Sequence, residues 1–369
     1  MSLPETRIII SGGGTGGHVF PAIAIAGALR SKDPGVNILF VGAQGRMEME
    51  KVPAAGYPIE GLWISGLQRR LSWENLLFPF KLIHSSIRAR KIIRGFKPHV
   101  VVGVGGYASG PTVKAAAAMG IPTLVQEQNS YPGITNKMLA RKAKKICVAY
   151  PGMERYFPAR KLVLTGNPVR PEIVHAMAKR REALEFFGLD ENRPVILAVG
   201  GSLGALTINR SLHSGLKTIA DAGIQLIWQT GRSYSDQAAS AVLPFSGAGI
   251  RQFPFITRMD LAYAASDVVI SRAGALAISE LCVTGRPSIL VPSPNVAEDH
   301  QTRNAMTLVT EGAALMVKDA EAEHKLVNTA IELAGNGQLR ESLSKQILTL
   351  GRENAAADIA ALIVECIKR

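Results

Sequence analysis

The chain has 369 residues, of which 47% are apolar, so it is long enough for two domains and apolar enough to build a core in each. Its net charge is +13, and all of the excess lies in residues 1–170, which hold 23 Lys and Arg against 8 Asp and Glu. Residues 171–369 hold 19 against 21. This asymmetry indicates an anionic partner for the first half: a nucleic acid, an acidic lipid or a phosphorylated substrate.

Cysteine usage and hydropathy limit the compartment. Cys147, Cys282 and Cys366 lie far apart, which excludes a disulfide framework or a CxxC metal pair and fits a reduced, cytoplasmic setting. The N-terminal apolar run is too short for a signal peptide, and no stretch reaches the roughly 18 apolar residues of a membrane-spanning helix. Membrane contact is therefore predicted to be peripheral.

In chain order, the first half alternates short β-branched runs with longer helical stretches, a pattern typical of parallel α/β units. A glycine-rich loop at 11–18 follows the first strand, and a segment rich in Pro and Gly at 164–171 predicts a linker. The predicted strands are 7–11, 37–41, 100–104, 123–126 and 145–149, and the predicted helices are 21–30 and 112–119.

The second half begins in the same way, with a strand, a glycine turn at 200–205 and a helix that ends near residue 221. Its predicted strands are 194–199, 224–228, 267–270 and 288–291, and its C-terminal end is predicted to be helical. Because both halves open on a strand, a glycine turn and a helix, we predict two doubly wound domains that face each other across a ligand-binding cleft.

The loop at 11–18 reads Ser-Gly-Gly-Gly-Thr-Gly-Gly-His and opens a helix, so its N–H groups could face an anion. It matches G-x-G-x-x-G formally, but the next strand ends without the carboxylate of a dinucleotide site, and no P-loop lysine follows. A tight turn without a ligand is the alternative. His18 is either a helix-start residue or a general base, since imidazole titrates near neutral pH.

Two further segments carry candidate ligand-binding residues. In the turn at 200–205, Ser202 could donate to a phosphate oxygen or simply cap the next helix. Glu280 follows a buried strand and could accept two hydrogen bonds from a ribose diol, although a surface glutamate is the alternative. The polar cluster at 299–304 suits either sugar hydroxyls or a helix cap.

Residues between Ile64 and Val100 include eight Lys and Arg and one acidic residue, interleaved with large apolar side chains. This pattern favours an interfacial membrane anchor, and a core-packed helix with a solvated basic face is the alternative. Nucleic acid is not expected as a partner because no binding motif accompanies the charge. The residues assigned to an anionic membrane surface are Trp73, Leu76, Phe78, Phe80, Lys81, Arg88, Lys91 and Arg94.

Six motifs, in this order along nearly the whole chain, resemble the bacterial MurG family. That family transfers N-acetylglucosamine from UDP-GlcNAc to lipid I, giving lipid II for peptidoglycan synthesis. The motifs are GGTGGHVFP at 13–21, GGYASGP at 105–111, EQN at 127–129, GNPVR at 166–170, GGSLGA at 200–205 and SE at 279–280.

The resemblance implies the GT-B fold, with an acceptor- and membrane-binding domain at 1–165 and a UDP-GlcNAc-binding domain at 166–351. The helix at 352–369 would pack back on the first domain. It also implies a peripheral position on the cytoplasmic face of the bacterial inner membrane, with UDP-GlcNAc, lipid I and other proteins of cell-wall synthesis as partners.

The resemblance implies roles for particular residues. Glu280 would hold the ribose, the Ile256 main chain would contact uracil, and Ser202 and Arg170 would face the diphosphate. The full set for UDP-GlcNAc is Thr15, Gly16, Gly17, Asn129, Arg170, Ser202, Ile256, Ala275, Leu276, Ala277, Ile278, Ser279, Glu280 and Gln301. The set for the acceptor diphosphate is Gly13, Gly14, Gly105 and Gly106.

One position departs from the family. Gln126 stands where the family commonly has His, which leaves His18 or Glu127 as the catalytic base. No Asp-x-Asp metal motif is present, so we expect neither a metal nor a cofactor, and the leaving charge would be met by helix N-termini and side-chain donors. The alternatives are a lipid glycosyltransferase acting on diacylglycerol, a UDP-GlcNAc 2-epimerase and a non-enzymatic membrane-docking protein.

Overall fold

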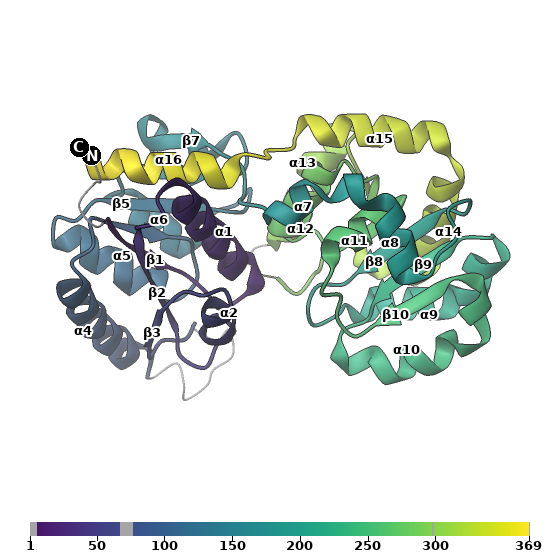
Figure 1. The fold of residues 1–369 in the computed structure, drawn as a ribbon, viewed down its shortest axis with the longest axis horizontal. Helices are drawn as coiled ribbons and strands as arrows, with labels where there is room; N and C mark the ends of the chain where they lie inside the picture. The colour runs from purple at the N-terminus through teal and green to yellow at the C-terminus, as the bar shows by residue number, and fades with distance from the viewer. Residues whose placement is uncertain (1–5, 67–76, 297–298, 369) are drawn as a thin grey trace. The chain divides into compact units, whose positions relative to one another are not determined.

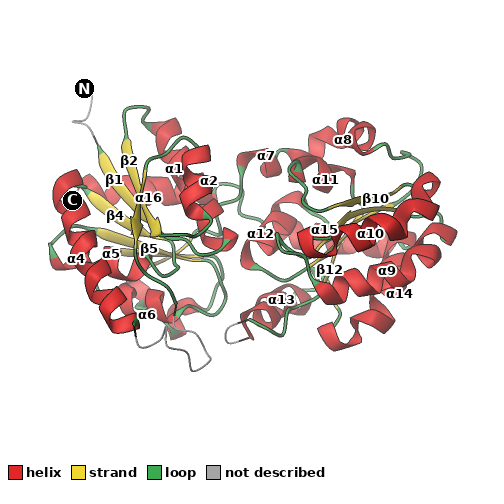
Figure 2. Cartoon of the chain, turned by 90° about the horizontal axis from the view of Figure 1, so that it is seen from below, coloured by secondary structure: helices red, strands yellow, loops and turns green. Residues whose placement is uncertain are grey.

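A computed structural model describes residues 6–66, 77–296 and 299–368 of the chain. Internal contacts divide the chain into two compact units: unit 1 is Met1–Arg170 with Glu353–Arg369, and unit 2 is Pro171–Arg352 (Figure 1). The boundary between unit 1 and unit 2 after Arg170 therefore lies five residues after the predicted domain boundary at 165. Each unit contains a parallel sheet with helices packed against it (Figure 2).

In the described part of unit 1, seven parallel strands form the sheet in the order β3-β2-β1-β4-β5-β6-β7. The five predicted strands are present to within two residues at each end, whereas β3 and β7 were not predicted. The strands are β1 (Arg7–Ser11), β2 (Asn37–Ala43), β3 (Ile59–Leu62), β4 (Val100–Gly103), β5 (Thr123–Glu127), β6 (Lys145–Val148) and β7 (Leu162–Leu164).

The two faces of this sheet bury separate cores. Side chains alternate along β1, so Ile8 and Ile10 join one core, with α1 (Gly16–Lys32) and α16 (Ala355–Lys368), while Ile9 joins the other. Figure 1 shows α16 beside α1. The second core is covered by α4 (Phe78–Phe96), α5 (Ser109–Ala118) and α6 (Ile134–Ala140), and α2 (Glu48–Ala54) follows β2.

Unit 2 has six parallel strands among its described residues, in the order β10-β9-β8-β11-β12-β13. Four were predicted; β10 and β13 were not. The strands are β8 (Val195–Val199), β9 (Gln225–Gln229), β10 (Ile250–Phe253), β11 (Val268–Ser271), β12 (Ser288–Leu290) and β13 (Leu315–Met316). The helices are α7 (Pro171–Val174), α8 (Arg180–Phe187), α9 (Leu206–Asp221), α10 (Ser235–Val242), α11 (Met259–Ala265), α12 (Ala275–Thr284), α13 (His300–Thr310), α14 (Ala322–Gly335) and α15 (Gly337–Thr349).

Both sheets reverse their strand order beside the first strand of the unit: between β1 and β4 in unit 1, and between β8 and β11 in unit 2. The carboxyl ends of strands at such a reversal are where open α/β sheets bind ligands, because the loops there diverge to opposite faces. The two glycine loops follow β1 and β8, so each lies at the reversal of its own sheet. No helix in the described part of the chain is both long and apolar enough to cross a membrane.

Candidate active site

A buried carboxylate holds the glycine loop of unit 1. Glu48, the first residue of α2, accepts hydrogen bonds from the N–H groups of Gly14 and Ala43, both at 2.9 Å. Its carboxylate lies against Gly13, whose φ is +147°, so closely that a Cβ there would be 2.1 Å from Oε1. Only glycine fits at this position. Because the Gly14 N–H is donated to Glu48, a phosphate in this loop would have to use other N–H groups.

The loop after β4 lies against this glycine loop. A Cβ on Gly106, whose φ is +83°, would be 2.2 Å from the carbonyl oxygen of Gly13. A Cβ on Gly105 would be 2.6 Å from Cδ2 of His18. The structure therefore brings the predicted acceptor-diphosphate glycines together and places the His18 ring beside them.

His18 lies in the first turn of α1, and its half-buried ring points one nitrogen at a hydroxyl. Its Nδ1 is 3.1 Å from Oγ1 of the exposed Thr15. The N–H groups of His18 and Val19 both donate to the carbonyl oxygen of Thr15, whereas those of Gly16 and Gly17 donate to no acceptor among the described residues. N–H groups of this kind at a helix start attract anions.

Glu127, the last residue of β5, uses its carboxylate within its own loop. Its Oε1 accepts from the N–H of Asn129 at 3.0 Å. Its Oε2 accepts from Nδ2 of Asn136 at 2.8 Å and from the N–H of Gly133 at 3.2 Å. The side chain is buried, and this burial raises the pKa of the carboxyl above its ordinary value. In this geometry Glu127 holds the loop that carries Asn129.

Gln126 belongs to a buried amide network. Its Nε2 donates to Oδ1 of Asn167 at 2.9 Å, and its Oε1 accepts from Nε2 of Gln128. Nδ2 of Asn167 in turn donates to the main-chain oxygen of Gln128 at 3.0 Å. This network uses the ability of an amide to donate and accept at once, and it ties β5 to the GNPVR motif.

In unit 2, Gln229 makes hydrogen bonds to the segments that follow β8 and β10. Nε2 of Gln229 donates to the carbonyl oxygen of Gly201 at 2.9 Å, and its Oε1 accepts from the N–H of Ile256 at 2.8 Å. Ile256 is predicted to contact uracil through its main chain, and its N–H is bonded to Gln229 in this structure. Ser202 lies beside Gly201 in the exposed glycine loop.

Glu280 is buried in α12, and a tyrosine holds its carboxylate. The hydroxyl of Tyr263, on α11, donates to Oε2 of Glu280 at 3.1 Å. The predicted residues 275–279 form the first turns of the same helix. At the start of α13, Oε1 of Gln301 accepts from the N–H of Ser293 at 2.8 Å. These residues all follow the carboxyl ends of strands in unit 2.

The residues predicted to bind UDP-GlcNAc are divided between the units. Thr15, Gly16, Gly17, Asn129 and Arg170 belong to unit 1, and the remainder belong to unit 2.

No motif or periodicity in the sequence marked Glu48, Gln229 or Tyr263. Each acts through a partner far away in the chain, so only the folded structure shows its role.

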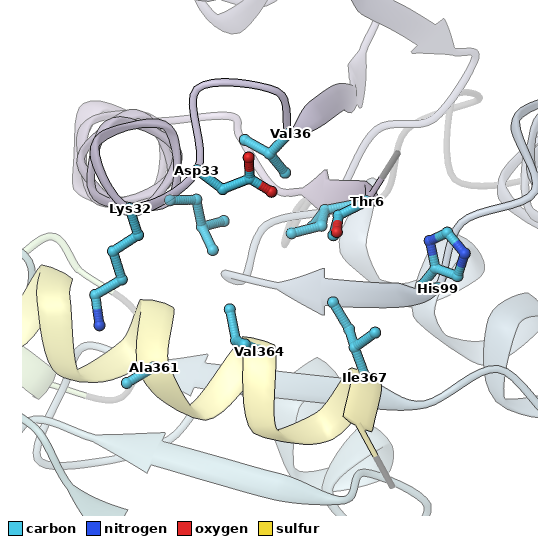
Figure 3. A pocket seen from close by; sticks show the side chains of 10 residues that line it. Thr6, Lys32, Asp33, Val36, His99, Ala361, Val364 and Ile367 are labelled. Carbon is cyan, nitrogen blue, oxygen red and sulfur yellow. The ribbon is translucent and has the colours of Figure 1, made fainter. Parts of the chain in front are cut away.

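A cavity of about 360 Å³ in unit 1 lies at the opposite end of β1 from the glycine loop (Figure 3). Thr6 and Ile8 line it at the start of β1, and Val364 and Ile367 of α16 line it from the other side. None of the predicted site residues lines this cavity. It lies at the amino ends of the strands, away from the edge at which α/β sheets bind ligands.

Helix α4 presents an apolar stripe to solvent. Phe80, Ile83 and Ile87 are 66%, 60% and 63% exposed, at helical spacings of three and four residues. The exposed cations Arg90 and Arg94 continue the same stripe. The apolar part of this face extends along the helix as far as Ile87.

The residues predicted to meet the membrane fall into three groups. Trp73 and Leu76 lie outside the described residues. Lys81 donates to a serine hydroxyl and Arg88 pairs with Glu60 at 2.8 Å, so both cations are engaged within unit 1. The others are the half-buried Phe78 and the exposed Phe80, Lys91 and Arg94.

Comparison with known proteins identifies the family. The sequence matches the glycosyltransferase family 28 N-terminal domain over residues 8–148 and the family's C-terminal domain over residues 195–363. The chain belongs to glycosyltransferase family 28. This membership confirms the two-domain GT-B fold and makes the protein a glycosyltransferase.

Two curated relatives are named UDP-N-acetylglucosamine–N-acetylmuramyl-(pentapeptide) pyrophosphoryl-undecaprenol N-acetylglucosamine transferase. The one from Parabacteroides distasonis is 54% identical and covers 98% of this chain and 99% of its own length. The one from Porphyromonas gingivalis is 56% identical and covers 99% and 97%. These matches confirm the resemblance to the MurG family.

Solved structures agree with this family 28 assignment. MurG from Acinetobacter baumannii is 29% identical, covers 98% of this chain and 100% of its own, and superimposes with a TM-score of 0.77. A UDP-GlcNAc 2-epimerase from Neisseria meningitidis is 14% identical over similar coverage, with a TM-score of 0.68. At that identity the epimerase shares the fold alone.

Proposed function

We propose that this glycosyltransferase moves N-acetylglucosamine from UDP-GlcNAc to the 4-hydroxyl of the muramic sugar of lipid I, giving lipid II and UDP. The observation that carries the proposal is identity of 54% and 56%, over nearly the full length of both chains, to relatives named for this transfer. Unit 2 binds the nucleotide sugar, and unit 1 binds the acceptor and the membrane. The charge of the two halves supports this division, because only the first half is basic.

In unit 2, the buried Glu280 accepts hydrogen bonds from the ribose hydroxyls, and Tyr263 holds its carboxylate in place for them. Ser202, in the exposed glycine loop, donates to the diphosphate of the donor. The Ile256 carbonyl accepts from the N–H of the uracil ring.

The chemistry is an inverting displacement. The acceptor hydroxyl oxygen attacks the anomeric carbon, the bond from that carbon to the UDP oxygen breaks, and the α-linked sugar becomes β-linked. His18 takes the hydroxyl proton, since its ring lies beside the acceptor-diphosphate glycines and an imidazole suits general-base catalysis near neutral pH. The charge that develops on UDP is stabilised by helix N-termini and by donors such as Ser202 and Arg170.

Unit 1 meets the cytoplasmic face of the inner membrane through α4, without spanning it. Phe80, Ile83 and Ile87 enter the boundary between head groups and acyl chains, and the neighbouring cations meet anionic head groups. This position would place a lipid-linked acceptor close to the enzyme that uses it.

The test is an assay of radiolabelled UDP-GlcNAc with three acceptors in detergent, without added divalent metal: lipid I, diacylglycerol and no lipid. Transfer to lipid I alone supports the proposal. Label on diacylglycerol would make the protein a different lipid glycosyltransferase, and UDP-linked epimer formed without lipid would make it an epimerase. Absence of any product with lipid I would overturn the proposal.

A further inference from the structure

Gln229 lies where three strands of unit 2 end together. It is the last residue of β9, which runs between β8 and β10, and its register partners are Val199 on one side and Phe253 on the other. Its side chain is only 3% exposed. A buried polar group at this point needs partners, and the loops that follow the two neighbouring strands supply them.

The amide of Gln229 makes one hydrogen bond to each of these loops. It donates to the carbonyl oxygen of Gly201 at 2.9 Å and accepts from the N–H of Ile256 at 2.8 Å. These partners fix the orientation of the amide, since the carbonyl needs the nitrogen and the N–H needs the oxygen. Neither a carboxylate nor an aliphatic side chain could make both bonds.

The two loops have different tasks in the proposed function. Gly201 precedes Ser202 in the loop assigned to the diphosphate, and Ile256 belongs to the segment assigned to uracil. The next residue, Thr230, also bonds toward β10, its N–H donating to the carbonyl oxygen of Phe253 at 2.9 Å. The end of β9 is therefore hydrogen-bonded to the loop proposed to bind the diphosphate and to the segment proposed to bind uracil.

We propose that Gln229 is a positioning residue for the donor. It fixes the uracil-binding segment relative to the diphosphate-binding loop, so that the two segments can contact the base and the diphosphate of the same UDP molecule. This inference rests on the proposed function.

The chain offers a matched control on the same strand. Gln225, the first residue of β9, is 1% exposed. Its Oε1 accepts from the N–H of Asp190, and its Nε2 donates to the main-chain oxygens of Asp190 and Arg193. Gln225→Leu therefore damages the same strand, by the same substitution, at its opposite end. Its effect measures what a merely structural glutamine contributes.

The experiment compares Gln229→Leu, Gln229→Glu and Gln225→Leu in the full-length protein, with steady-state kinetics and calorimetric binding of UDP, uridine and pyrophosphate. We expect Gln229→Leu to raise the KM for UDP-GlcNAc about tenfold, the loss of two hydrogen bonds of ordinary strength, while the KM for lipid I stays unchanged. UDP binding should weaken more than the binding of uridine or pyrophosphate alone, because coupling of the two loops is what is lost.

Gln229→Glu keeps the acceptor for Ile256 and the side-chain shape, but it removes the donor to Gly201 and adds a negative charge. It should therefore weaken UDP binding more than uridine binding, and it serves as the second variant if Gln229→Leu does not fold. Gln225→Leu should leave the donor KM within twofold of the wild type.

Two results would overturn the inference. One is an equal rise in donor KM in Gln225→Leu and Gln229→Leu, which would mean general damage to the sheet. The other is unchanged UDP binding in both Gln229 variants. A wild-type protein that binds no UDP and makes no lipid II would instead contradict the proposed function, and the inference would fail with it.

Discussion

The two glycine loops of this protein follow equivalent strands of similar sheets, but buried side chains of different character hold them. Glu48 accepts a hydrogen bond from an N–H group of the unit 1 loop, whereas Gln229 donates one to a carbonyl group of the unit 2 loop. The carboxylate uses up a loop donor and adds a negative charge. The amide uses up a loop acceptor and adds no charge.

This difference shows how one architecture separates two tasks. Under the proposed function the unit 2 loop binds the donor diphosphate, so its residues should act mainly on donor affinity. In unit 1 the buried charge fixes the loop beside His18, so residues there should act on turnover and on stability.

The largest effect is expected from His18→Ala. Turnover should fall by about 10²–10⁴-fold, the usual contribution of an acid–base residue, while the dissociation constant for UDP should stay close to that of the wild type. Steady-state kinetics and calorimetry measure the two quantities. His84→Ala, which changes an exposed histidine on α4, is the control. Turnover of His18→Ala within about tenfold of the wild type would place the base elsewhere.

Glu48→Ala should be the next most harmful change. It leaves the N–H groups of Gly14 and Ala43 without their acceptor in a buried site, which should lower the free energy of unfolding by roughly 2–5 kcal/mol. Denaturant unfolding measures this loss. Glu48→Gln, which keeps one acceptor oxygen, should lose less. If Glu48→Ala were as stable as the wild type, the carboxylate would not be what shapes the loop.

A third prediction concerns the basic face of unit 1. The double substitution Arg90→Glu and Arg94→Glu should weaken binding to vesicles with anionic lipid by at least about tenfold, since each cation near such a surface contributes about 1 kcal/mol. The loss should shrink as ionic strength rises. Flotation or surface plasmon resonance with vesicles of defined composition measures it.

The control for this pair is Arg232→Glu with Arg352→Glu, which makes the same change in net charge on exposed residues of unit 2. Equal loss of binding in both pairs would mean that net charge, and not the α4 face, governs membrane contact. Ile83→Ser with Ile87→Ser should weaken binding in a way that salt does not change, because the contribution lost is apolar.

The smallest effects concern pH, and they should have opposite signs in the two units. Burial raises the pKa of Glu127 above 4.5, so the folded state binds the proton more tightly than the unfolded state does. The ionised carboxylate is therefore unfavourable in the folded state, and Glu127 lowers the free energy of unfolding as pH rises above 4.5. Asp260 in unit 2 is hydrogen-bonded to Arg258 and Lys179, which hold its pKa well below 3.8. Its stabilisation is present above 3.8 and is lost as pH falls.

Unfolding free energies of the wild type, Glu127→Gln and Asp260→Asn between pH 3 and pH 7 measure both trends. Relative to Glu127→Gln, the wild type should lose stability as pH rises above 4.5. Relative to Asp260→Asn, it should lose stability as pH falls below 3.8. The same sign for both pairs would contradict the assignment of these two carboxyl groups.

The central strands could be predicted from the sequence, whereas the strands β3, β7, β10 and β13 could not. The central strands are runs of β-branched and apolar residues buried on both faces, which is a strong signal. Among the others, β3 reads Ile-Glu-Gly-Leu, with no continuous apolar run. Their pairing depends on the neighbour that they meet, and the local sequence does not contain that information.

The start of α1 shows the same limit. The sequence predicted a helix from residue 21, but α1 begins at Gly16, because the last glycines of the loop join its first turn. Glycine has a low helix propensity, so this turn depends on its surroundings. The candidate site shows the same dependence on distant partners. The motifs indicated His18, Ser202 and Glu280, whereas nothing in the local sequence indicated Glu48 and Gln229, which hold the glycine loops.

The return of α16 to unit 1 has a consequence for biosynthesis. Ile359, Ala360 and Ile363 are completely buried in the core that α1 shares, yet they are translated after the whole of unit 2. During translation, the apolar face of unit 1 that α16 covers therefore stays exposed until the last helix has been synthesised. By that time unit 2 has all of its residues and can fold. Such a face invites aggregation or chaperone binding, so translation of the last helix, rather than of the first domain, is the step that completes the N-terminal half.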